Sequence, residues 1–426
     1  MTPIDHPQRY ALVSELHARP FPRITAPGTM CFVAFKEETQ AARRDRGRDF
    51  AHLAELIHRY GGTAPEAGVT HWSGELGRHF IRWESHTEFV TYSAFESGQA
   101  AVPFDPAATQ VFGAAWQDRA PGRRLCAVLV RIETMPEPEA EVKAQLEQWF
   151  VPESLAVARV MDAEGIVAGD FRIDPAGNMR FAVFVRPGVG PGRLGRLVQR
   201  ICEIEIYRAM SMLGLGRARE LGGRLDRCES EMSDLVDAMK SNARPAEAIL
   251  DELLRISAEL ESMAVRFSYR AGATAAYQAI VQDRIEALRE ERFAGRQTFS
   301  EFMRRRYDPA MRTVKSSEKR LGEMVERTAR AAELLRTRVD VERSAQNQKL
   351  LASMDKRSDL QLRLQATVEG LSVVAISYYA VSLVSYLLYP LAEGMGVSKG
   401  VLTAAAVPPV MLTVWLMIRR IHKRIH

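Results

Sequence analysis

The chain has 426 residues, of which 26% are charged and 46% are hydrophobic, an ordinary balance for a folded protein with room for roughly two or three domains. Its formal net charge of +5 comes with no basic patch interleaved with aromatic residues, so we expect no nucleic-acid partner. The 4 cysteines are scattered without a CxxC pair, which argues against a disulfide framework and against a zinc site.

The first residues contain no apolar run suited to a signal peptide, so we expect the soluble part to lie in the reducing cytoplasm. Residues 1–190 alternate between strand and helix patterns. The order recurs and predicts two β-α-β-β units that build one mixed sheet with helices packed on it. The predicted elements are a strand at 30–35, a helix at 37–60, paired strands at 79–85 and 87–95, a strand at 124–132, a helix at 138–150, and strands at 154–161, 165–173 and 179–185.

Histidine is concentrated near the start of the chain. Seven of the 9 histidines precede residue 87, namely His6, His17, His52, His58, His71, His79 and His86. Their spacing matches no zinc pattern, and the chain contains no GxSxG, P-loop or kinase signature. We therefore expect no enzyme, no catalytic residue, no bound metal and no cofactor.

Gly190, Gly192 and Gly195 satisfy G-x-G-x-x-G after the strand at 179–185. A dinucleotide site also needs a second strand with an acidic residue about 20 residues further on. The chain continues instead into a long helical pattern, which favours a glycine-rich linker between domains.

The spacing of apolar residues in the middle of the chain predicts a layer of long helices that pack as in a coiled coil. Two heptad seams, joined by a turn at Pro245, indicate an antiparallel helical hairpin; they consist of Leu221, Leu225, Cys228, Met232, Leu235 and Met239, and of Ile249, Leu253, Ile256, Leu260, Met263 and Phe267. A further helix is predicted to have Asp308 as its cap and Pro309 at its first position, and to continue without another proline to Glu369 as a stalk of roughly 90 Å that enters the next segment.

Two uncharged segments follow, at 370–392 and 400–418. Each has the length of a transmembrane helix, and the alternative is a hairpin buried in a soluble core. Pro408 and Pro409 are expected to kink the second span. Basic residues flank both outer ends, namely Lys356, Arg357 and Arg363 before the first span and Arg419, Arg420, Lys423 and Arg424 after the second. Both termini are therefore predicted to be cytoplasmic.

One face of the first span carries small or hydroxyl-bearing residues at steps of 3, 4, 3, 4 and 3: Ser372, Ala375, Tyr379, Ser382, Tyr386 and Tyr389. We refer to these six residues as the hydroxyl stripe. Such a face suits a pore that passes hydrated cations by polar contacts. It equally suits close packing between membrane helices, and the sequence leaves both interpretations open.

Two segments, HPQRYALVSELHARPFP at 6–22 and VEGLSVVAISYYAVSLVSYLL at 368–388, resemble a family of uncharacterised bacterial membrane proteins known only as a domain of unknown function. The resemblance implies a multi-pass protein of the bacterial inner membrane. In the first segment, Glu15, His17 and Arg19 are candidates for a ligand-sensing motif. The alternative is that they pair or cap at the end of a short helix stopped by Pro20.

The order of parts resembles CorA-type magnesium channels, which are homopentamers whose first spans line the pore. Their periplasmic loop carries Gly-Met-Asn. Here Gly394 and Met395 match, whereas Gly396 replaces the asparagine that helps to bind the hydrated ion. The resemblance implies a pore mouth at Glu393, Gly394, Met395 and Gly396, with Ser372, Tyr379 and Ser382 lining the pore. Glu393 would supply charge in place of the asparagine.

The sequence thus predicts an α+β cytoplasmic domain at 1–190, a long-helix layer and stalk at 191–368, and two transmembrane helices with a basic tail at 369–426. The leading functional hypothesis is a homo-oligomeric channel or transporter for divalent cations in the lipid bilayer. The first alternative is a membrane-anchored scaffold or ligand sensor without transport activity. A membrane-bound enzyme that uses His71 and His79 is the third.

Overall fold

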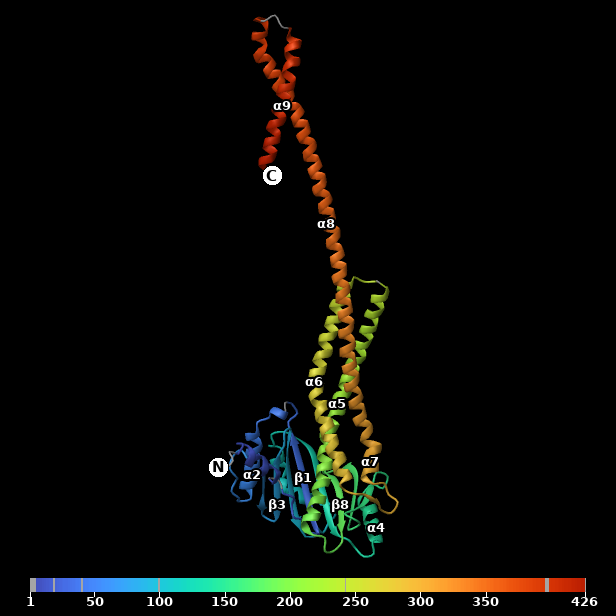
Figure 1. Cartoon of the computed structure of the whole chain (residues 1–426). Helices are drawn as coiled ribbons and strands as arrows, with labels where there is room; N and C mark the ends of the chain where they lie inside the picture. The colour runs from blue at the N-terminus through green and yellow to red at the C-terminus, as the bar shows by residue number, and fades with distance from the viewer. Residues whose placement is uncertain are drawn as a thin grey trace. The chain divides into compact units, whose positions relative to one another are not determined.

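The computed structural model describes residues 5–17, 20–39, 41–98, 100–241, 243–394 and 398–425 (Figure 1). The chain forms two compact units, one made of Met1–Ala243 and Asp251–Ala331 and the other of Arg244–Leu250 and Ala332–His426. The α+β class, the mixed sheet and the long C-terminal helices are confirmed. The division at residues 190 and 368 stays a prediction.

A sheet that has nine strands within the described residues organises the first unit, with the strand order β2-β3-β4-β1-β5-β8-β7-β6-β9. Neighbouring strands are antiparallel except for β5 and β8, which are parallel. The strands are β1 (Gly28–Lys36), β2 (His71–Leu76), β3 (His79–Ser85), β4 (Phe89–Ser97), β5 (Arg123–Thr134), β6 (Ala156–Val160), β7 (Gly165–Ile173), β8 (Met179–Val185) and β9 (Glu291–Arg292).

The predicted internal repeat is present and is larger than the sequence indicated. β1, a helix and β2–β4 form the first half, and β5, a helix and β6–β8 form the second, with the same spatial order in each half. The prediction missed β2 and β9. β2 contains Ser73, Gly74 and Glu75 and lies at the edge of the sheet, so it lacks the alternation of large apolar residues that marks a half-buried strand.

Among the described residues, the helices are α1 (Arg9–His17), α2 (Arg46–Arg59), α3 (Ala114–Gln117), α4 (Ala140–Trp149), α5 (Pro191–Ser241), α6 (Ala246–Glu286), α7 (Phe299–Arg306), α8 (Asp308–Gly394) and α9 (Lys399–Ile425), with the 3-10 turns η1 (Ala41–Arg43) and η2 (Pro106–Phe112). The helix predicted at 37–60 is wrong in its first part. Asp45 caps α2 by accepting a hydrogen bond from the Gly47 amide at 2.8 Å, so the helix begins only after it.

Helices cover both faces of the sheet. The side chains of β1 alternate between two buried clusters, as the period of a strand requires. Met30, Phe32 and Ala34 lie in the cluster that includes residues of α5, α6, α7 and the start of α8. Cys31, Val33 and Phe35 lie in the cluster that includes residues of α2, α3 and α4.

The two helical seams are buried as predicted, except that Met239 is only half-buried. Ion pairs that join Arg224 to Glu259 at 3.0 Å and Arg255 to Glu231 show that α5 and α6 run antiparallel. A short helix, α7, precedes the helix predicted from Asp308. The start of α7 has a capping box: the Thr298 hydroxyl accepts a hydrogen bond from the Glu301 amide, and the Glu301 carboxylate accepts one from the Thr298 amide.

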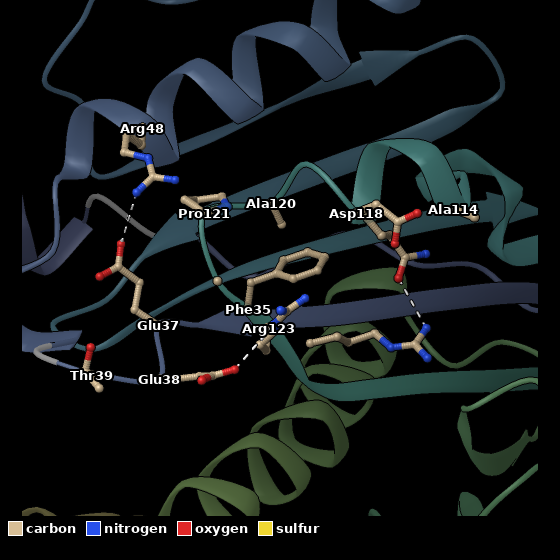
Figure 2. A pocket seen from close by; sticks show the side chains of 13 residues that line it. Phe35, Glu37, Glu38, Thr39, Arg48, Ala114, Asp118, Ala120, Pro121 and Arg123 are labelled. Atoms are coloured by element: carbon tan, nitrogen blue, oxygen red, sulfur yellow. Dashed lines mark hydrogen bonds and ion pairs between the residues drawn. The ribbon is translucent and has the colours of Figure 1, made fainter.

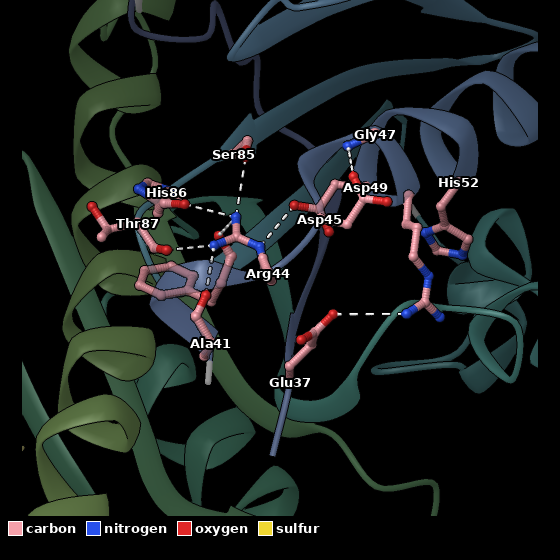
Figure 3. A network of polar contacts seen from close by, with 12 residues as sticks. Glu37, Ala41, Arg44, Asp45, Gly47, Asp49, His52, Ser85, His86 and Thr87 are labelled. Atoms are coloured by element: carbon pink, nitrogen blue, oxygen red, sulfur yellow. Dashed lines mark hydrogen bonds and ion pairs between the residues drawn. The ribbon is translucent and has the colours of Figure 1, made fainter. Parts of the chain in front are cut away.

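A buried arginine fixes the start of α2 to the turn between β3 and β4 (Figure 3). The Arg44 side chain is 2% exposed, and its Nε donates to the Asp49 carboxylate at 2.8 Å. Its two terminal nitrogens donate to the carbonyl oxygens of Thr87 at 2.5 Å and of His86 at 2.7 Å. This guanidinium satisfies carbonyl groups that the turn leaves without strand partners.

All four cysteines are buried, and we expect them to be unreactive in the native protein. Cys31, Cys126, Cys202 and Cys228 are each at most 5% exposed, and burial raises the pKa of the Cys31 thiol to about 12. The reactive thiolate is therefore scarce at neutral pH. With a chromogenic disulfide reagent, the native protein should release almost no colour over several minutes. The protein unfolded in guanidinium should react at all four thiols, and fast labelling of the native protein would contradict this account.

Candidate functional site

In the part of the chain that the structure describes, two helices are long and apolar enough to cross a membrane, one within Phe299–Pro390 and the other at Lys399–Arg420. Their large apolar side chains are mostly exposed within the isolated chain. Leu383 and Leu387 on α8 are 68% and 78% exposed. Since large exposed apolar surfaces are unfavourable in water, this exposure favours a lipid environment or a partner chain.

Burial in this hairpin is concentrated on one face of each helix. On α8 the less exposed positions include Val373, Ser377, Val381, Val384 and Leu388, at steps of four or three. On α9 the most buried residues are Ala406 and Val414. One-sided burial of this kind is the pattern of two helices that pack on each other.

The hydroxyl stripe lies roughly opposite this buried face of α8, given the 3.6-residue period of a helix. Tyr379 and Tyr386 are 68% and 74% exposed, whereas Ser382 is half-buried. The hydroxyl groups of Ser372 and Ser382 donate to the carbonyl oxygens four residues earlier in the helix, at 2.8 and 2.9 Å. Each serine proton is thus used inside the helix, and the lone pairs of each oxygen remain able to accept hydrogen bonds from water.

The predicted pore mouth falls mostly outside the described residues. Gly394 is the last residue of α8, and Glu393 precedes it in the same helix. The side chain of Glu393, and Met395 and Gly396 altogether, lie outside the description. At the start of α9, the Lys399 ammonium lies 5.4 Å from the centroid of the Tyr389 ring. The end of the hydroxyl stripe therefore has a positive charge beside it.

A second candidate is a hollow of about 600 Å³ at the end of residues 15–22, which we call the ELHARPFP segment. Pro20, Phe21 and Pro22 line one side of it, and residues of β2 and β3, including Trp72 and His79, line the other. Of the predicted sensing motif, Glu15 and His17 belong to α1 but their side chains lie outside the description, and so does Arg19. The sensing hypothesis thus stays a prediction for these three residues.

Arg78 and His79, which line this hollow, share a carboxylate from outside its lining. The Glu96 carboxylate lies 3.1 Å from Arg78 Nε and 3.3 Å from His79 Nε2. Burial lowers the pKa of His79, against the raising effect of Glu96. The His79 Nδ1 atom is buried without a hydrogen-bond partner among the described residues. Within those residues, no three histidine, cysteine or acidic side chains gather as a metal site would require.

The ELHARPFP segment also explains one glycine of the G-x-G-x-x-G pattern. A Cβ atom built on Gly195 would lie 1.7 Å from the Pro22 carbonyl oxygen, and the nearby Ile24 amide donates to the Pro191 carbonyl at 3.1 Å. The glycine therefore allows the chain at Pro22 to lie directly on the first turn of α5. Packing of the chain on itself accounts for Gly195, without a nucleotide.

We expect Gly195→Ala to destabilise the first unit by about 1–3 kcal/mol, because the added methyl group would force the backbone at Pro22 away from α5. Gly192→Ala is the matched control in the same turn, since a Cβ atom built there would have only the end of the Arg196 side chain within 4 Å, at 3.9 Å. The control should be neutral or slightly stabilising. Chemical unfolding followed by tryptophan fluorescence measures both, and equal effects would contradict the close contact.

A third hollow, of about 640 Å³, lies beside the end of β1 and has Phe35 in its lining (Figure 2). The formal charges of its lining cancel, because three acidic and three basic side chains contribute to it. They are Glu37, Glu38 and Asp118, and Arg48, Arg123 and Arg124. Arg123 Nε lies 3.3 Å from the Glu38 carboxylate and Arg48 Nη1 lies 3.9 Å from Glu37. With balanced charges and two such ion pairs, this hollow is a weak candidate for a charged ligand.

A family described as "Protein of unknown function (DUF3422)" matches residues 4–425, which is nearly the whole chain. No curated protein matches the chain.

Proposed function

We propose that this chain, which belongs to the DUF3422 family, is a multi-pass protein of the bacterial inner membrane that assembles as a homo-oligomer and conducts divalent cations. α8 and α9 would be its two spans, with both termini cytoplasmic. The observation that carries the proposal is the position of the hydroxyl stripe, mostly exposed, on the side of α8 away from its buried face.

The chemistry of the stripe fits a hydrated cation. Water molecules around a cation point their hydrogens outward, so a pore that keeps them must accept hydrogen bonds. The Ser372 and Ser382 oxygens have this capacity because their own protons are already donated within α8. The stripe has no charged side chain, so it would neither trap a divalent cation tightly nor repel it.

A pore lined by one helix from each chain requires several copies around a rotation axis. The stripe is able to face such an axis because the most buried face of α8 uses other positions. Exposed apolar residues on the flanks, including Ile376 and Leu387, would then contact neighbouring copies or lipid.

Reconstitution into liposomes tests the proposal. Purified protein in vesicles loaded with a dye that reports Mg²⁺ or Co²⁺ should give cation entry well above that of empty vesicles. Vesicles with an unrelated two-span protein serve as the control for leakage. Entry no faster than in these controls, at a protein density confirmed by gel, would contradict conduction.

A second candidate is a membrane-anchored ligand sensor without transport. Two observations favour it: the hollow that Pro20–Pro22 line, and the Lys399 ammonium near Tyr389, which would repel a cation at that end of the stripe. In this case the hairpin only tethers the chain. A sensor needs no ring of copies, so a monomer in detergent would favour it over conduction.

A further inference from the structure

A larger hollow, of about 870 Å³, lies in the first unit between the segment after β1 and the helices α5 and α6. We call it the basic cleft. Six cationic and two acidic side chains line it, namely Lys36, Arg43, Arg217, Arg224, Arg266 and Arg270 with Glu38 and Glu220. These residues come from three distant parts of the sequence, and their formal charge is strongly positive.

Carboxylates neutralise only part of this charge. Arg217 pairs with Glu220 at 2.9 Å and Arg224 pairs with Glu259 at 3.0 Å. Glu38 pairs with Arg123 at 3.3 Å, and Arg123 does not line the cleft. Within the described part of the chain, neither Arg43 nor Arg266 makes an ion pair.

Two further cations of the cleft, Lys36 and Arg270, have polar groups that the fold only partly satisfies. The Lys36 ammonium donates to the Glu37 carbonyl oxygen at 2.9 Å, and burial, together with Arg270 and Arg217, lowers the pKa of Lys36. Arg270 donates through Nη2 to Glu88 at 2.6 Å, while its Nη1 is buried without an acceptor among the described residues. An anion in the cleft would relieve both groups.

We propose that the basic cleft binds a molecule that carries a chain of phosphate groups. Phosphate oxygens match arginine and lysine donors, and several phosphates are needed to engage Lys36, Arg43 and Arg266 together. The ring of Tyr269, which is 53% exposed at the wall of the cleft, provides a flat surface for an organic part of the ligand. The cleft lies within the first unit, so this binding does not depend on the proposed pore.

The test is calorimetric titration of the detergent-solubilised full chain with inorganic tripolyphosphate at about physiological ionic strength, at which loosely held surface charges are screened. We expect saturable binding that weakens about tenfold for Arg266→Gln and for Arg43→Gln. Arg312→Gln is the matched control, because Arg312 is an exposed arginine on α8 that does not line the cleft. It should bind as the unchanged protein does.

Absence of saturable binding, or an equal loss in the control variant, would overturn the proposal. Melting temperatures of the variants show whether the fold is intact. A repeat in nanodiscs with and without anionic phospholipid identifies the source of the phosphate. Weaker tripolyphosphate binding with anionic lipid assigns the cleft to lipid headgroups, and unchanged binding assigns it to a soluble phosphorylated molecule.

Discussion

Replacing Arg44 by alanine is expected to reduce the free energy of unfolding of the first unit by about 3–5 kcal/mol, because it leaves the Asp49 carboxylate buried and unpaired. The Asp49 side chain is 1% exposed, and its second oxygen already has no hydrogen-bond partner among the described residues. The carbonyl groups of His86 and Thr87 would lose their donor in the same step.

Urea unfolding followed by the fluorescence of the buried Trp83 and Trp116 measures this loss. Arg46→Ala is the matched control, since Arg46 lies close by in the sequence and is exposed, and it should change stability by less than about 0.5 kcal/mol. The double change Arg44→Met with Asp49→Leu should recover part of the loss, because it removes the buried charge together with its partner. Similar values for Arg44→Ala and Arg46→Ala would show that the network contributes little.

The pH dependence of the Arg44→Ala variant gives an independent check. Burial raises the pKa of Asp49, while Arg44 opposes that rise. When folding raises the pKa of a carboxyl group, the free energy of unfolding of the protein falls as the pH rises through the folded-state pKa. Without Arg44 the pKa rises further, so the deficit of the variant should be larger at about pH 8 than at about pH 5. A deficit that does not change with pH would contradict a charged Asp49 as its cause.

The second large effect is expected from Ser382→Leu, which should reduce cation flux in liposomes at least about tenfold while leaving the protein folded. The substitution replaces an oxygen acceptor of the hydroxyl stripe by an apolar side chain, and in the proposed oligomer it would do so in every copy. A narrow pore that becomes apolar loses its water and closes to hydrated ions.

Val374→Leu is the matched control, because it also adds apolar bulk to α8, at a residue that is 68% exposed and belongs neither to the stripe nor to the buried face. Its flux should remain near that of the unchanged protein. Both variants should elute from size-exclusion chromatography at the same volume as the unchanged protein. Undiminished flux through the Ser382→Leu variant would show that this face of α8 does not line a pore.

Much of the sheet could be predicted from the sequence, because its central strands are buried on both faces and are rich in apolar residues. β1, β5 and β8 are examples. The edge strand β2 could not be predicted in this way, because it is short and most of its residues are not buried. The predicted start of α2, at residue 37, is too early. Residues 37–45 include many charged helix formers, so the sequence pattern does not mark the true start, which the Asp45 cap sets.

Features that depend on tertiary contacts could not be predicted from the sequence. Arg44 stands within a charged run that suggests a solvated surface, and only the β3–β4 turn makes it a buried donor. The hydroxyl stripe could be predicted from helical periodicity, but its position opposite the buried face of α8 depends on where the helix packs. The basic cleft combines Lys36, Arg217 and Arg266, whose separation along the chain gives no signal in a single sequence.

The most direct test of the proposed function is the molar mass of the detergent-extracted full-length protein, measured by light scattering with the detergent contribution subtracted. A channel lined by one α8 helix per chain predicts a ring of several copies, and the resemblance to CorA-type channels predicts a pentamer. A monomer or a dimer would contradict the pore and would leave the hairpin as a membrane anchor.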